Sequence, residues 1–199
     1  MNHWLEYFGV VTGFLYLWLE IKQHRAMWIV GLLTSLTYVF VFFFAKIYAD
    51  MGLNIYYVAI SIYGWMEWAK GSTPVPAEAT DDSSIIYRHT TLPLLIRIVA
   101  AIVALQLLLY AILRYLTDSP IPMGDAFTTA VGIVATWMLA RRIIEHWVFW
   151  VVVNAVSVYL YYLRGLYPTM LLYTAYGLLA IIGYYTWKKK GTQDYENRL

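Results

Sequence analysis

Long uncharged stretches of apolar residues recur from one end of this 199-residue chain to the other. Each is long enough to cross about 30 Å of hydrocarbon at a helical rise of about 1.5 Å per residue, so we predict seven membrane-spanning helices. They cover residues 5–21, 27–45, 51–69, 92–116, 125–140, 147–163 and 168–187. Charged residues make up only 13% of the chain, against about 25% in soluble domains, so a water-soluble fold is excluded. The predicted fold class is an all-α integral membrane protein.

The connections between these helices divide the chain into parts. Only one connection is long, over residues 71–91, and its prolines and acidic pair predict a loop. The predicted order is a first three-helix bundle over 1–70, this loop, a linking transmembrane helix over 92–118, a second three-helix bundle over 119–190 and a tail over 191–199.

Basic residues are unequally distributed between the two sides of the membrane. Seven spans place the termini on opposite sides, and of the 14 basic residues only Lys46, Arg114 and Arg164 then lie on the side of the N-terminus. The positive-inside rule therefore predicts a cytoplasmic C-terminus, loop and tail, with the N-terminus outside.

The two predicted bundles repeat each other without a gap, because residues 6–70 align on residues 125–189 at a constant offset of 119. Identical pairs include Trp28 and Trp147, Gly64 and Gly183, and Trp68 and Trp187. Since the offset spans four helices, corresponding helices run in the same direction and the predicted 3+1+3 repeat is parallel. Parallel repeats of this kind are a transporter architecture with a substrate site between the bundles.

Polar and aromatic side chains form a stripe along each of four predicted helices. In the helix over 147–163 the stripe contains Trp147, Trp150, Asn154 and Ser157, whose spacing places them on one face. Because such a face is unfavourable against lipid, we expect the four stripes to line one channel. The members from the other three helices are Trp28 and Ser35, then Asn54, Tyr57 and Trp68, then Tyr173 and Tyr176. These groups suit a flat ligand that forms hydrogen bonds, including a cationic one.

A second interpretation applies to the tryptophans near helix ends. Trp68, Trp147 and Trp187 also fit the aromatic belt at the membrane surface, which we favour for each of them taken singly. Trp150 and Asn154 lie further along their helix, beyond the interface, so there we favour a binding site.

Other polar residues inside or near the spans are less informative. Glu67 faces either a cationic ligand or its neighbour Lys70, and Gln106 makes either a hydrogen bond between helices or a ligand contact. We expect Glu20 to be interfacial and His146, at a loop edge, to be a surface residue.

Several classes of function are excluded by missing motifs. The chain has no cysteine, no Gly-x-x-x-x-Gly-Lys-[Ser/Thr] phosphate loop and no His-Glu-x-x-His helix, so we expect no catalytic activity, no cofactor and no metal. A retinal Schiff base needs a lysine in the last span, and none lies between Tyr167 and Trp187. The net charge of +2 gives no reason to expect a nucleic-acid partner.

A family resemblance is carried by four segments, Tyr48–Asp50, Ser61–Trp68, Glu145–Asn154 and Gly183–Trp187, the third with the pattern Trp-x-x-Trp-x-x-x-Asn. Over about residues 6–188 the chain resembles the PnuC family of bacterial vitamin transporters. The resemblance implies a SWEET-like 3+1+3 bundle, a homotrimer in the bacterial inner membrane, and facilitated uptake of nicotinamide riboside, an NAD precursor that a cytoplasmic kinase then traps by phosphorylation. It also implies that Trp147, Trp150 and Asn154 line the substrate cavity and that Gly64–Trp68 lies beside it.

Two alternatives stay open. Relatives in the same family carry thiamine or riboflavin, and Glu67 stands where members specific for nicotinamide riboside tend to have Gln. The alternative substrate is thiamine or another B vitamin; nicotinamide riboside and thiamine are both cations, so the charge of Glu67 does not choose between them. A membrane receptor or scaffold that binds a partner helix is the third interpretation, because small-residue faces and belt tryptophans are expected there as well.

Overall fold

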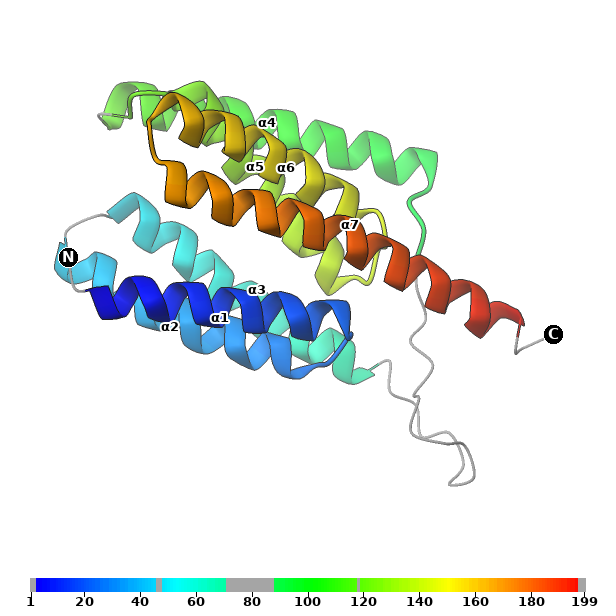
Figure 1. Ribbon diagram of the computed structural model, residues 1–199. Helices are drawn as coiled ribbons and strands as arrows, with labels where there is room; N and C mark the ends of the chain where they lie inside the picture. The colour runs from blue at the N-terminus through cyan, green and yellow to red at the C-terminus, as the bar shows by residue number, and fades with distance from the viewer. Residues whose placement is uncertain (1–2, 46–47, 71–87, 118, 197–199) are drawn as a thin grey trace. The chain divides into compact units, whose positions relative to one another are not determined.

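The structure, a computed structural model, describes residues 3–45, 48–70, 88–117 and 119–196. These residues form seven α-helices, and each predicted span falls on one of them. The helices are α1 (His3–Ile21), α2 (Ala26–Ala45), α3 (Tyr48–Lys70), α4 (Leu92–Leu116), α5 (Pro122–Ala140), α6 (His146–Leu163) and α7 (Tyr167–Glu196) (Figure 1). Helix α7 continues to Glu196, so it includes most of the tail predicted over 191–199. The predicted loop over 71–91 lies largely outside the described residues.

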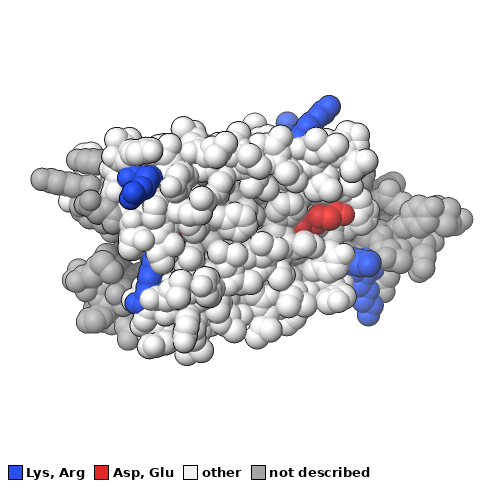
Figure 2. All heavy atoms as spheres, turned by 90° about the horizontal axis from the view of Figure 1, so that it is seen from above, with Lys and Arg blue, Asp and Glu red and all other residues white. Residues whose placement is uncertain are grey.

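Five of the described helices, α2, α4, α5, α6 and α7, are long and apolar enough to cross a membrane. The apolar part of α1 that the structure describes is shorter, Val10–Ile21, and α3 carries polar residues along its length. Figure 2 shows one face of the molecule with a broad uncharged area and Lys and Arg side chains toward its two ends. An all-α, multi-pass membrane protein is confirmed, while the number of seven spans stays a prediction.

The chain forms two compact units, residues 1–86 with α1–α3 and residues 87–199 with α4–α7. Helix α4 therefore packs with the second bundle. Its buried Ile98 shares a core with Val134 and Met138 of α5 and with Ile143. Gln106 of α4 donates a hydrogen bond through Nε2 to the carbonyl oxygen of Met123 at 3.2 Å, which confirms the interpretation as a bond between helices.

The corners between α1 and α2 and between α5 and α6 have the same backbone geometry. Gln23 has φ 61° and Arg142 has φ 57°, a left-handed conformation that is uncommon for residues other than glycine. The amide hydrogen bonds of the two corners also match: Gln23 to Glu20 and His24 to Leu19 in the first, Arg142 to Leu139 and Ile143 to Met138 in the second. All of these positions are related by the offset of 119 residues.

Residues 88–90 run along the α5–α6 corner. Arg88 donates its amide to the carbonyl of Arg142 and accepts the amide of Ile144, each at 3.1 Å. The carboxylate of Glu145 accepts hydrogen bonds from the backbone N and Oγ1 of Thr90 at 3.1 and 3.0 Å, and His89 Nδ1 lies 2.9 Å from its other oxygen. We call residues 88–90 the strap, because they hold the segment before α4 against this corner.

The strap changes the acidity of Glu145. Partial burial alone would raise the pKa of Glu145, but the hydrogen bonds from His89 and Thr90 outweigh it and hold the pKa below its ordinary value of 4.5. The carboxylate therefore stabilises the fold above about pH 4.5, and this stabilisation is lost as the pH falls through the lowered value.

We expect Glu145→Gln to lower the free energy of unfolding by about 1 kcal/mol at neutral pH, because charge-assisted hydrogen bonds at a partly exposed site are lost. Thermal unfolding of both proteins in detergent at a series of pH values tests this. The two unfolding curves should converge as the pH falls below the lowered pKa of Glu145, where the wild-type carboxyl is protonated. A difference that stays constant down to that pH would contradict the proposed role of the carboxylate.

A second polar contact ties the start of α5 to the end of α6. Arg164 donates from Nη2 to both carboxylate oxygens of Asp125 at 2.7 and 2.8 Å, and Ser119 Oγ donates to the same carboxylate at 2.7 Å. The strap and this ion pair thus hold the second bundle at opposite ends of its helices. In the first bundle the offset of 119 places Ala26 and Ala45 at the positions of Glu145 and Arg164.

Candidate functional site

Two tryptophans pack against each other inside the first bundle. Trp28 of α2 and Trp68 of α3 are edge-to-face, with ring centroids 5.9 Å apart and planes at 80°, and both are fully buried. A Cβ added at Gly64 of α3 would lie 2.5 Å from the Trp28 ring, closer than real contacts allow. Glycine at this position is therefore what lets the indole approach α3 so closely.

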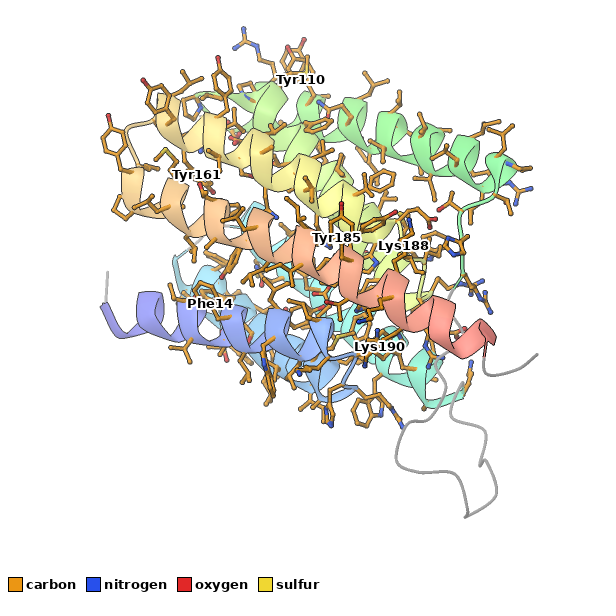
Figure 3. All side chains as sticks on the ribbon, turned by 45° about the vertical axis from the view of Figure 1, so that its right-hand side comes forward. Phe14, Tyr110, Tyr161, Tyr185, Lys188 and Lys190 are labelled. Atoms are coloured by element: carbon orange, nitrogen blue, oxygen red, sulfur yellow. The ribbon has the colours of Figure 1, made fainter. Side chains whose placement is uncertain are left out.

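The second bundle contains the same arrangement. Trp147 of α6 and Trp187 of α7 are edge-to-face at 5.8 Å and 83°, both fully buried, and a Cβ added at Gly183 would lie 2.5 Å from the Trp147 ring. The aromatic-belt interpretation of Trp68, Trp147 and Trp187 is therefore wrong, because all three side chains are fully buried. For Trp147, the absence of a side chain at Gly183 leaves room for the indole. On α7 the contrast is with Tyr185, two residues before Trp187, whose side chain is exposed (Figure 3).

Each of these two bundles holds one indole N–H donor with unused hydrogen-bonding capacity. Among the described residues, no hydrogen-bond acceptor contacts Nε1 of Trp28 or Nε1 of Trp147, and both atoms are buried. Buried polar atoms without a partner are uncommon in native proteins. Both donors are therefore candidates for contact with an oxygen atom of a ligand.

The polar stripe of α6 faces the bundle interior. Asn154 and Ser157 are buried, and Trp150 is half-buried. The Cβ of Asn154 lies 3.5 Å from the place that a Cβ at Gly177 of α7 would occupy, so this side chain is directed toward α7. A buried amide on an apolar helix needs hydrogen-bond partners, which a polar ligand can supply.

The tyrosines predicted on α7 lie beside the end of α6. The ring of Tyr173 is 5.0 Å from that of Tyr161 and 5.9 Å from that of Tyr176; Figure 3 labels Tyr161. The second bundle thus places Trp147, Asn154 and these tyrosines along the two adjacent helices α6 and α7.

The predicted residues of the first bundle lie on α2 and α3. Ser35 is buried, while Asn54 and Tyr57 are partly buried. Glu67 Oε2 lies 3.8 Å from Nζ of Lys70, so the ion pair between these neighbours, one of the two interpretations of Glu67, is present in the structure. That Glu67 contacts a ligand, and that the stripes of the two bundles line one channel, stay predictions.

Two buried polar residues were not expected at these positions. Glu20 is 3% exposed instead of interfacial, because it follows Tyr16 by one turn on the face of α1 that packs against Gly31 of α2. His146 is fully buried instead of on the surface. The repeat contains the signal for it, because the offset of 119 pairs His146 with Met27, an apolar residue at the start of α2 that is also fully buried.

The described residues contain no group of three or more His, Asp or Glu side chains that could hold a metal ion.

These features define a class, a multi-pass helical membrane protein with buried aromatic pairs and a polar helix face inside its bundles, as small-molecule transporters have. The family model described as nicotinamide mononucleotide transporter matches residues 3–189. The chain belongs to this family, which includes the PnuC proteins that its motifs resemble.

The names of individual relatives give different substrates. The nicotinamide riboside transporter PnuC of Escherichia coli is 26% identical over 203 residues, which cover 92% of this chain and 84% of that protein. The riboflavin/roseoflavin transporter RibM of Streptomyces davaonensis is 27% identical over 195 residues, which cover 96% and 87%. A crystal structure of the vitamin B3 transporter PnuC superposes with a TM-score of 0.76 at 26% identity, over 97% of this chain and 84% of that one.

Proposed function

We propose that this protein carries nicotinamide riboside into the cell across the bacterial inner membrane by facilitated diffusion. The observation that carries the proposal is the buried α6 face with Trp147 and Asn154, in a fold shared with a vitamin B3 transporter. Indole rings offer stacking and cation–π contact to a pyridinium ring, and the Asn154 amide can bond the polar groups of the nucleoside. Family membership implies a role without catalysis.

We propose further that the binding site lies between two parallel three-helix bundles in a SWEET-like 3+1+3 arrangement of seven spans. The matching corners at Gln23 and Arg142 and the matching tryptophan pairs support a repeat. We propose that the first bundle contributes Trp28, Ser35, Asn54, Tyr57 and Trp68 to the site, with Glu67 beside it. The second bundle contributes Trp147, Trp150, Asn154, Ser157, Tyr173 and Tyr176.

Orientation, assembly and trapping complete the proposal. The excess of basic residues near the C-terminus supports a cytoplasmic C-terminus and an outside N-terminus. The family resemblance supports a homotrimer and a functional link to a cytoplasmic kinase that phosphorylates the vitamin. Without such a kinase, transport ends when the concentrations on the two sides are equal.

Riboflavin is the second candidate substrate, because the relative RibM is as similar in sequence as the nicotinamide riboside transporter of Escherichia coli. The family resemblance keeps thiamine as a third. Nicotinamide riboside and thiamine are cations, riboflavin is neutral, and all three have different ring systems, so parallel measurements separate them.

Uptake of labelled nicotinamide riboside, riboflavin and thiamine into proteoliposomes tests the proposal. We expect nicotinamide riboside to equilibrate fastest and to exchange across the membrane in counterflow, without accumulation above the outside level. If none of the three vitamins enters faster than it enters liposomes without the protein, the receptor or scaffold interpretation is supported instead. Accumulation above the outside concentration, driven by an ion gradient with no kinase inside, would overturn the proposal of facilitated diffusion.

Glu67 offers a test of substrate recognition. The Nζ atom of Lys70 lies 3.8 Å from the Glu67 carboxylate, and the Lys70 side chain is largely exposed, so this ion pair is weak. We therefore expect Glu67→Gln to change the affinity for nicotinamide riboside by under about 0.5 kcal/mol. The affinity for an uncharged analogue, reduced nicotinamide riboside, should change by the same amount. Tryptophan quenching measures both affinities. A loss of about 1 to 2 kcal/mol for the cationic ligand alone would instead place the carboxylate beside the pyridinium ring.

A further inference from the structure

The buried imidazole of His146 contacts both indoles of the second bundle. Its ring centroid lies 4.7 Å from that of Trp147 with planes at 38°, and 4.9 Å from that of Trp187 at 64°. With the indole pair at 5.8 Å, the three rings form a closed group in which each ring contacts the other two. We call His146, Trp147 and Trp187 the aromatic triad.

One hydrogen bond sets the orientation of the imidazole. His146 Nδ1 lies 2.7 Å from the carbonyl oxygen of Ile143. A carbonyl oxygen can only accept, so Nδ1 carries a proton and donates it. The ring is therefore bonded at Nδ1 to the backbone of the α5–α6 corner and also packs against both indoles.

That corner is itself fixed from outside. The strap residue Arg88 accepts the amide of Ile144, and the Glu145 carboxylate accepts two hydrogen bonds from Thr90. Contacts therefore run from the strap to the corner, from the corner to His146, and from His146 to the two indoles.

The first bundle provides an internal comparison. Met27, also fully buried, occupies the matching position before Trp28, and the Trp28–Trp68 pair has almost the same geometry as the Trp147–Trp187 pair. Met27 thus takes the place of His146 in the repeat, but its thioether is flexible and has no N–H to bond the corner. The second bundle, which has Trp150 and Asn154 on the α6 face, has a planar, hydrogen-bonded ring instead.

We propose that His146 is a positioning residue for ligand binding: anchored to the Ile143 carbonyl, it holds the indoles of Trp147 and Trp187 in the orientation that the substrate meets. This inference rests on the proposed role of the α6 face in binding. A role in space-filling alone predicts a different outcome, because methionine occupies the matching buried position in the first bundle.

The test compares the full-length wild type with His146→Met and His146→Asn in detergent. Methionine keeps the volume and removes the donor, whereas asparagine keeps a donor near the position of Nδ1. Three readouts are needed: thermal unfolding, the near-ultraviolet circular dichroism of the tryptophan pair, and the Kd for nicotinamide riboside and riboflavin by tryptophan quenching. The contribution of the pair to the dichroism is defined by the difference between wild type and Trp187→Phe.

We expect His146→Met to unfold within a few degrees of wild type, to lose the dichroism of the pair, and to bind its ligand about tenfold more weakly. His146→Asn should recover part of both losses, and Met27→Leu at the matching position should leave the Kd within about twofold. If His146→Met folds with wild-type dichroism and wild-type Kd, His146 only fills space and the inference is overturned. If His146→Met does not fold, His146→Asn decides by the same two readouts.

Failure of the proposed function has a different signature. A wild type that binds riboflavin but not nicotinamide riboside overturns the proposed substrate, and the Kd comparison is then made with riboflavin. A wild type that binds neither vitamin overturns vitamin binding, and with it the role of His146 in binding, whatever the dichroism shows.

Discussion

Replacing Gly183 by alanine is expected to destabilise the second bundle and to weaken ligand binding at least tenfold. The added Cβ would lie 2.5 to 2.6 Å from three ring atoms of Trp147, which is fully buried and also in contact with His146 and Trp187. The indole therefore has no free direction in which to move, and overpacking of this kind costs about 1 to 3 kcal/mol. Thermal unfolding in detergent and ligand titration by tryptophan quenching measure the two effects.

The chain contains matched controls for this substitution. Gly64→Ala makes the same contact with Trp28 in the first bundle and should destabilise by a similar amount. Gly52→Ala in α3 meets no atom within 4 Å, so there the gain in helix propensity should leave stability unchanged or slightly higher. Truncating the ring with Trp147→Phe should restore part of the stability lost in Gly183→Ala. If Gly183→Ala is as stable as Gly52→Ala, the close approach of the Trp147 ring to α7 is wrong.

Asn154→Leu is expected to weaken ligand binding as well, but without loss of stability. Asn154 is 6% exposed, and leucine has a similar size without an amide that needs hydrogen bonds, so the free energy of unfolding should stay the same or rise. Binding of nicotinamide riboside should weaken by about 1 to 3 kcal/mol, because polar groups of the ligand lose their partner in a buried site. Unfolding and titration of the same preparation separate the two quantities.

The repeat supplies the control for Asn154. Ser35 occupies the matching position in α2 and is also buried, so Ser35→Ala tests whether the two bundles contribute equally. We expect Ser35→Ala to weaken binding less than Asn154→Leu, since a hydroxyl offers fewer hydrogen bonds than an amide. A larger loss for Ser35→Ala would move the main recognition site to the first bundle.

Helix positions could be predicted from the sequence because the signal for them is local. Runs of apolar residues and the charged or proline-containing breaks between them determine where each helix begins and ends, and six of the seven helices end within about one residue of the prediction. Helix α7 is the exception, because apolarity ends near Trp187 while the backbone continues as a helix to Glu196. The membrane class and the family resemblance also depend on residue type and spacing alone.

The sequence by itself thus determined the all-α membrane class, the helix positions, the offset of 119 that relates the two bundles, and the polar face of α6. Only the tertiary structure decided which side chains are buried. From the sequence, Trp147 is predicted to be a belt residue, but in the structure it is buried where Gly183 of α7 leaves room for its ring. His146 is predicted to be a surface residue, but in the structure its ring contacts both indoles. The physical reason is that helical periodicity is a property of one segment, whereas the burial of a side chain depends on the shape of a neighbouring helix that lies far away in the sequence.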